Sequence, residues 1–291
     1  MNRLLLAASL LVPFMISAEP LKLQTRARTL NAVSGGKYEP VARAAQWDPK
    51  KTAVIVCDMW DDHWCKGAAA RVGEMTPRMD EVLRTMRQRG VFVVHAPSTV
   101  TDFYKDTPQR KRAQTAPTSK PPVPLETKHE RWGTCWLYPD PDREPAFPID
   151  DTDMGCDCKV KCKIEPPWKR QIAGLSIGPD DAITDSGAEL WNLLAARGIT
   201  QIVFLGVHTN MCVLGRPFAI RQLVKLGLNV VLVRDLTDTM YNSAMRPFVS
   251  HYEGTELVVQ HIEKYWCPTI TSTDLVGKPA FRFKEDPRAG K

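Results

Sequence analysis

The sequence contains no long run of lysine and arginine, and its formal net charge of +6 is spread over 291 residues. This absence argues against a nucleic-acid partner, because solubility alone explains a modest, dispersed charge. After Pro20, no apolar segment approaches the length needed to span a bilayer. No Cys-x-x-Cys pair stands at a predicted helix start, which disfavours disulfide exchange as a function.

The first eighteen residues have the pattern of a secretory signal. A basic start at Arg3 precedes an apolar run from Leu4 to Ile16, and the small residues Ser17 and Ala18 precede an acidic position. We predict that residues 1–18 form a signal peptide and that the chain is exported to a periplasmic or extracellular location. An uncleaved anchor is the alternative; after cleavage we expect no membrane association.

Short apolar runs alternate with helical patterns through most of the chain. Six runs are predicted strands, at 52–57, 91–95, 181–184, 202–205, 230–233 and 269–271. With 43% hydrophobic residues, the chain has enough core for one large α/β domain. We predict a three-layer αβα domain over 51–275, with a six-stranded, mainly parallel sheet that resembles a Rossmann fold.

Three segments lie outside this pattern. Residues 19–50 form an irregular N-terminal extension, and residues 276–291 form a charged tail. Residues 97–171 are a long insertion rich in proline and cysteine. Because such segments are uncommon inside compact domains, we expect the insertion to be functional, tied by disulfides, or a partly disordered surface excursion.

Two polar residues follow buried strands at positions suited to chemistry. Asp58 follows the first predicted strand, and in parallel sheets the catalytic and ligand-binding groups gather at the carboxyl ends of strands. Cys212 opens a helical pattern after the fourth strand, where backbone N–H groups and the helix dipole would lower its thiol pKa. Cys212 is therefore a candidate nucleophile, and a small buried hydrophobe is the alternative. A turn or N-cap role is the alternative for Asp58.

The loop after Asp58 carries large rings. Trp60, His63 and Trp64 follow the strand end, where they are expected to line a substrate pocket. Packing against a neighbouring helix is the alternative. Asp61 and His63 also have spacing that suits a divalent metal ion, although we expect no metal or other cofactor there.

Eight cysteines are present. Cys57 lies within a strand and Cys212 is the candidate nucleophile, and in an oxidising compartment the remaining six are expected to form three disulfides of undetermined connectivity. A zinc cluster built from three closely spaced cysteines and one other is the alternative. The six are Cys65, Cys135, Cys156, Cys158, Cys162 and Cys267.

The insertion also contains an acidic turn. Asp151, Asp153 and Asp157 surround a glycine in the manner of half a calcium-binding loop. No glutamate stands at the distance that such a loop requires. A plain acidic turn is therefore favoured over a metal site.

Taken together, Asp58 and the stretch Gly206-Val207-x-Thr209-x-x-Cys212-Val213 resemble the isochorismatase-like cysteine hydrolases, a superfamily that includes the nicotinamidases. The resemblance covers roughly 50–95 and 172–275. It implies that Cys212 is the nucleophile, that Asp58 is the general base and that a lysine assists them. It also implies a cis peptide between Val207 and His208, with backbone N–H groups directed at an oxyanion. The N–H groups of Met211 and Cys212 are the candidate donors.

The sequence departs from the family pattern in three places. Asp185 stands where the family has its lysine, and the nearest lysine upstream is Lys169. The Asp-x-Gln opening of the family and the Asp-x-His metal motif of nicotinamidases are both missing.

We predict an exported hydrolase that cleaves an amide or related C–N bond of a small molecule through a Cys212 thioester. His208 is expected among the pocket residues, and a homo-oligomer is an open option. A non-catalytic binding or assembly module is the alternative.

Overall fold

The computed structural model describes residues 19–31, 35–125 and 141–288. Eight strands form one sheet in the order β2-β1-β8-β7-β6-β3-β4-β5. Six of them pair in parallel and correspond to the six predicted strands, which confirms the fold class. These are β3 (Thr52–Cys57), β4 (Phe92–Ala96), β5 (Ala182–Ile183), β6 (Gln201–Val207), β7 (Asn229–Asp238) and β8 (Thr269–Ile270).

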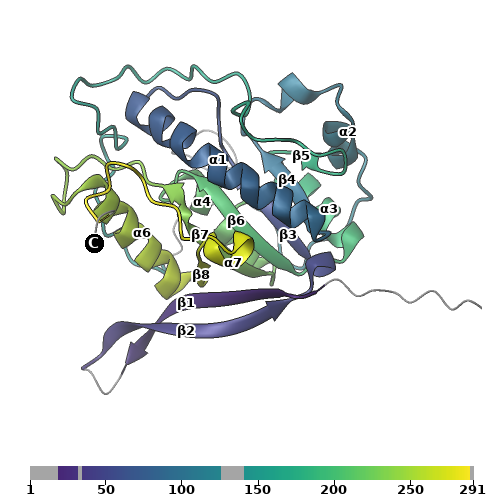
Figure 1. Ribbon diagram of the computed structural model, residues 1–291, viewed down its shortest axis with the longest axis horizontal. Helices are drawn as coiled ribbons and strands as arrows, with labels where there is room; N and C mark the ends of the chain where they lie inside the picture. Colours follow the sequence, from purple (N-terminus) through teal and green to yellow (C-terminus); the bar gives the residue numbers. More distant parts are fainter. Residues whose placement is uncertain (1–18, 32–34, 126–140, 289–291) are drawn as a thin grey trace, which may run out of the picture.

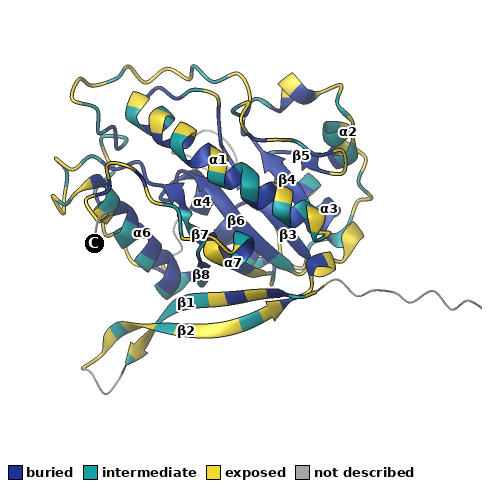
Figure 2. Ribbon diagram, in the orientation of Figure 1, coloured by how far each residue is buried: buried dark blue, intermediate teal, exposed yellow. Residues whose placement is uncertain are grey.

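Helices cover both faces of the sheet (Figure 1). Alternate residues of β3 enter different cores: Ile55 packs in a cluster with residues of α3, α5 and α6, whereas Val54 packs in one with residues of α1 and α7. The parallel strands are therefore buried between two helical layers, whereas the outer helix faces, the surface loops and most of the strand Lys37–Trp47 are exposed (Figure 2). The helices are α1 (Lys66–Gln88), α2 (Pro108–Gln114), α3 (Gly187–Arg197), α4 (Cys212–Gly215), α5 (Ile220–Lys225), α6 (His251–Tyr265) and α7 (Thr273–Val276).

The N-terminal extension was predicted to be irregular, and this prediction is wrong. Strands β1 (Leu21–Asn31) and β2 (Lys37–Trp47) form an antiparallel pair, here called the hairpin, which lies along one edge of the domain (Figure 1). The hairpin joins the sheet where Arg26 pairs with Thr269 of β8. The sequence carried a signal for β1, because Leu21 and Leu23 alternate with polar residues, and both leucines are buried.

The insertion is more regular than predicted. It contains a 3-10 turn, Thr101–Tyr104, and the helix α2, whose N-cap Thr107 accepts a hydrogen bond from the backbone N–H of Arg110. Helix α1 begins at Lys66, directly after the loop that carries Trp60, His63 and Trp64, and it continues through Pro77.

The predicted signal peptide, residues 1–18, lies outside the described residues. Within the part of the chain that the structure describes, none of the helices has the combination of length and apolar character that a membrane crossing requires.

Candidate active site

Asp58 and Cys212 come together because β3 and β6 are adjacent parallel strands. Cys57 pairs with Gly206 at the carboxyl ends of these strands, so the residues that follow emerge at one edge of the sheet. The pairing requires a glycine: Gly206 has a φ of +115°, and a Cβ there would lie 2.1 Å from the carbonyl oxygen of Cys57. The structure thus brings together the two residues that the sequence analysis paired.

The Asp58 carboxylate is buried among groups that can direct a proton. Its Oδ1 accepts a hydrogen bond from the backbone N–H of Ser98 at 2.7 Å. Its Oδ2 lies 3.6 Å from Nε of Arg216 and has no hydrogen-bond partner of good geometry among the described residues. The thiol of Cys212 is hydrogen-bonded to the same carboxylate, and as a result each group shifts the pKa of the other. Asp58 is therefore in position to accept the proton of Cys212.

Arg216 supplies a positive charge that the sequence analysis missed. It follows α4 directly, and its side chain is 15% exposed. A signal was available, because Cys212 and Arg216 are four residues apart and a helix that begins at Cys212 brings them to the same face. The resemblance pointed to Lys169 for this role. Lys169 is instead exposed, and its backbone N–H donates to Asp61 at 2.9 Å, so Arg216 replaces it as the cation beside Asp58.

The expectation of a lowered thiol pKa at Cys212 is wrong. Burial, and then the charge of Asp58, raise the pKa of this thiol to about 12, although Arg216 opposes the effect. Helix α4 spans only Cys212–Gly215, so its dipole is small. Burial likewise raises the pKa of Asp58 above its ordinary value, while Arg216 and Cys212 lower it. The resting site therefore pairs a neutral thiol with an adjacent base.

The backbone around the nucleophile differs in part from expectation. The peptide bond between Val207 and His208 is cis, and the N–H of His208 is directed at the sulfur of Cys212. The N–H of Met211, which was expected to face an oxyanion, donates to the carbonyl oxygen of His208 at 3.0 Å. Met211 is therefore not an available oxyanion donor in this conformation.

Aromatic rings form a wall beside the nucleophile. Trp168, from the end of the insertion, stacks on Trp60 with ring centroids 4.4 Å apart and on His63 at 5.4 Å. His63 also contacts Trp64 at 5.1 Å and His208 at 4.8 Å. The structure thus brings Trp60, His63 and Trp64 together as predicted. It adds Trp168, whose position depends on the insertion and was not evident from the sequence.

The two histidines in this wall are neutral. Burial lowers the pKa of His63 to about 4, and burial together with the nearby His63 lowers the pKa of His208 well below its ordinary value. Nε2 of His208 is buried and has no hydrogen-bond partner among the described residues. It is therefore a polar atom that a bound molecule can satisfy.

The comparisons with known proteins agree with this arrangement. Residues 182–265, which include Cys212 and Arg216, match the family model of the isochorismatase domain. The resemblance inferred from the sequence is confirmed over these residues. A search of curated proteins finds no match.

Solved structures similar to this chain include proteins from several bacteria and an archaeon. A cysteine hydrolase from Pseudomonas syringae pv. phaseolicola has 20% identity and a TM-score of 0.49, with 79% of this chain and 92% of that chain covered. An isochorismatase from Pseudomonas putida has 12% identity and a TM-score of 0.47, covering 85% and 98%. A zinc complex of the pyrazinamidase of Pyrococcus horikoshii has 17% identity and a TM-score of 0.42, covering 76% and 99%.

The cysteines outside the isochorismatase motif are not paired as expected. All seven described cysteines are free thiols, and Cys135 lies outside the described residues, so the predicted disulfides are not present in this structure. Cys267 is buried beside Leu232. The other four, Cys65, Cys156, Cys158 and Cys162, lie together at the start of α1.

The acidic residues considered for metal binding have other partners. Asp61 accepts the backbone N–H groups of Lys169 and Arg170, and Nδ1 of His63 accepts that of Cys65. The acids of the turn bind separate groups: Asp151 bonds to Asn210, Asp153 to Asn242 and Asp157 to Arg71. These carboxylates fasten the insertion to the isochorismatase domain instead of converging on one point.

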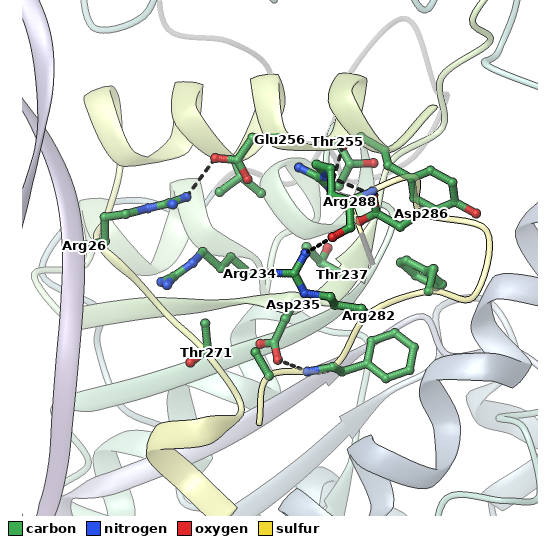
Figure 3. Close-up of a pocket in the computed structure, with 15 residues that line it drawn as sticks. Arg26, Arg234, Asp235, Thr237, Thr255, Glu256, Thr271, Arg282, Asp286 and Arg288 are labelled. Atoms are coloured by element: carbon green, nitrogen blue, oxygen red, sulfur yellow. Dashed lines mark hydrogen bonds and ion pairs between the residues drawn. The ribbon is translucent and has the colours of Figure 1, made fainter. Parts of the chain in front are cut away.

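A cavity of about 700 Å³ lies away from the nucleophile (Figure 3). Its lining includes Arg26 of β1, Arg234 of β7 and Glu256 of α6, together with residues of the C-terminal tail. Cys212, Asp58 and the aromatic wall are not among the lining residues. This cavity is therefore not the reaction site of the isochorismatase domain.

Proposed function

We propose that this chain is a cysteine hydrolase that cleaves an amide or related C–N bond of a small molecule through a thioester on Cys212. The observation that carries the proposal is the buried pair of Cys212 and Asp58, with the partly buried Arg216 beside them, at one edge of the sheet. A nucleophile, a base and a cation in contact are what acyl transfer to sulfur requires.

In the first step, the sulfur of Cys212 attacks the carbonyl carbon while Asp58 takes the thiol proton. The raised pKa of Cys212 means that little thiolate exists beforehand, so proton transfer accompanies attack. The tetrahedral intermediate then collapses, the C–N bond breaks, and the leaving nitrogen takes the proton from Asp58. An amine departs and a thioester remains.

In the second step, water attacks the thioester carbon with Asp58 as the base. The C–S bond breaks, the sulfur recovers a proton, and a carboxylic acid leaves. The amide N–H of Cys212 is the donor we assign to the oxyanion, because that of Met211 is bonded to His208. Arg216 lowers the pKa of Asp58 and so opposes the effect of burial.

The substrate that best fits this wall is a small, flat molecule. Trp60 and Trp168 stack on one another with an interplanar angle of 15°, and this stack gives the wall a flat aromatic face on which a substrate ring can pack. Nε2 of His208 offers one polar contact to a bound molecule. Because His208 is neutral, this contact suits an uncharged polar group of the substrate. We therefore propose an aromatic or heteroaromatic primary amide as the substrate class.

The test is to trap the acyl-enzyme. The full chain is incubated with a panel of small aromatic amides and the corresponding activated esters, quenched in acid and measured by intact mass. The proposal expects an acyl adduct on Cys212, hydrolysis that is lost in Cys212→Ala, and a control variant, Cys267→Ala, that turns over normally. If neither adduct nor turnover occurs while Cys212 resists alkylation, the chain is instead a non-catalytic binding or assembly module.

We also propose that the mature enzyme is exported. The support is the basic, apolar and small-residue pattern of residues 1–18. The test is N-terminal sequencing of the protein from cell fractions. A start at Glu19 in an extracytoplasmic fraction supports export, and a start at Met1 in the cytosol contradicts it.

A further inference from the structure

Four cysteines that the proposed reaction does not use lie together at the N-terminus of α1. Sγ atoms of Cys65, Cys156 and Cys158 all lie within 4.8 Å of one another. The thiol of Cys162 completes the group, because it interacts with those of Cys156 and Cys158. One thiol comes from the core domain and three come from the insertion, so the cluster joins segments about ninety residues apart.

The spacing of the sulfurs suits a single metal ion. Tetrahedral zinc has Zn–S distances of about 2.3 Å, which places its sulfur ligands about 3.8 Å apart. Sγ of Cys65 and Sγ of Cys158 are 3.8 Å apart. This separation far exceeds the roughly 2.05 Å of a disulfide bond. The thiols of Cys65, Cys156 and Cys158 thus lie around one point, with Cys162 next to two of them, and none of the four is in a disulfide.

Backbone N–H groups surround these sulfurs. The N–H of Gly67 donates to Sγ of Cys158 at 3.2 Å. The N–H groups of Lys66 and Ala68 are directed at the sulfurs of Cys162 and Cys65, and those of Cys158 and Cys162 at the sulfur of Cys156. Hydrogen bonds of this kind favour thiolates, because they stabilise negative charge on sulfur.

The first turn of α1 contributes a matching charge. Its N-cap, Cys65, makes no side-chain capping bond, and the first N–H groups of this long helix face sulfur atoms instead of a hydroxyl or carboxylate. The positive end of the helix dipole therefore points at the cluster. Four thiolates around a divalent cation carry a net charge of about −2, which this helix end stabilises.

We propose that Cys65, Cys156, Cys158 and Cys162 bind one structural zinc ion that fastens the insertion to α1. All four positions are filled by protein sulfur, so the site holds no open coordination position and is structural, not catalytic. Arg71 and Asp157 support it, since Asp157 lies between two ligands and bonds to Arg71 of α1 at 2.7 Å. Cys162 and Trp168 are close in sequence, so a zinc ion bound at Cys162 would restrict where the Trp168 ring of the aromatic wall can lie.

The first test uses the unmodified full chain. Protein purified without added chelator or reductant is analysed for metals by mass spectrometry and is then titrated with a mercurial reagent in the presence of a zinc-sensitive dye. The proposal expects about one zinc per chain, released as the clustered thiols react. Protein that contains no zinc and does not take up added Zn²⁺ overturns it, as does an intact mass lower by the hydrogens of two disulfides.

The second test separates the cluster from other thiols. Cys158→Ser should lose the zinc, whereas Cys267→Ser, which changes a buried cysteine elsewhere, should retain it. Added Co²⁺ should give the intense visible bands of tetrahedral thiolate coordination in the unmodified chain and in Cys267→Ser only. Equal zinc content in both variants contradicts the proposal. Because these readouts do not depend on turnover, they stand or fall separately from the hydrolase proposal.

Discussion

Nε of Arg216 lies 3.6 Å from Oδ2 of Asp58, in a pocket where the carboxylate is completely buried. Burial alone raises the pKa of Asp58, and Arg216 is the largest influence that lowers it. Burial alone also lowers the pKa of Arg216, yet the adjacent Cys212 and Asp58 raise it above the ordinary value. The arginine therefore stays charged, and it makes an ionised base possible in an apolar site.

We predict that Arg216→Ala lowers kcat/KM by about 10²–10³-fold, the usual cost of losing an electrostatic contact in the reaction site. Without the arginine, the pKa of Asp58 rises further, so the acid limb of the pH profile moves to higher pH. Arg216→Lys should restore part of the activity and part of the shift. The measurement is kcat/KM against pH for the three proteins; an unmoved acid limb in Arg216→Ala would contradict this role.

The contact between Asp58 and Cys212 allows the reactivity of the resting thiol and its catalytic activity to be tested separately. Because the charge of Asp58 helps to raise the thiol pKa to about 12, alkylation of Cys212 should accelerate up to high pH without a plateau near neutrality. Asp58→Asn removes that charge, so Cys212 should react faster with iodoacetamide at a given pH while hydrolysis is lost. Slower alkylation in Asp58→Asn would show that the carboxylate activates the resting thiol.

Much of the fold followed from the sequence because four of the six parallel strands, β3, β4, β6 and β7, contain nearly continuous apolar runs. Such runs mark strands buried on both faces, and their carboxyl ends locate Asp58 and the turn before Cys212. The hairpin was missed because β2 is mostly exposed and carries no apolar alternation, so only β1 gave a signal. Its register depends on pairing with β1, which composition does not reveal.

The contents of the site were harder to predict than its position. Arg216 was missed because the family pattern drew attention to a lysine, whereas spacing along α4 brings the arginine to the same carboxylate. Trp168 and the thiol cluster depend on how the insertion folds back, and its irregular sequence has no periodicity to show this. The pKa of Cys212 was misjudged because burial outweighs the dipole of a four-residue helix.

Trp168 should control access to the nucleophile. Cys212 is only 6% exposed, and the Trp168 ring stacks over the adjacent Trp60 and His63. We predict that Trp168→Ala accelerates alkylation of Cys212 about tenfold and raises KM, because one face of the aromatic wall is lost. Phe103→Ala, which removes an exposed ring from the same insertion, is the control. Equal alkylation rates in the two variants would exclude a covering role.

Protonation of the Glu144 carboxylate should make the protein less stable in acid. Burial raises its pKa, but His261 and Arg221 lower it more, to about 2. A carboxylate with a depressed pKa contributes stability that is complete above its unfolded pKa of about 4.3 and is lost as the pH falls toward 2. We predict a loss of roughly 3 kcal/mol over that window, measured by urea unfolding at several pH values. Glu144→Gln should be less stable at neutral pH and show a flatter dependence in acid.

Gly206 should be the least replaceable glycine of the sheet. An added Cβ would lie 2.1 Å from the carbonyl oxygen of Cys57, at a φ of +115°, so both strands next to the nucleophile would have to separate. We predict that Gly206→Ala lowers the free energy of unfolding by about 4 kcal/mol or more, an exceptional value for one methyl group. Gly227→Ala is the matched control, because it also has a positive φ, +82°, but nothing within 4 Å of the added Cβ. That variant should cost only about 1–2 kcal/mol, the strain of the left-handed backbone. Similar losses in the two variants, measured by urea unfolding, would show that close contact between β3 and β6 does not limit this position.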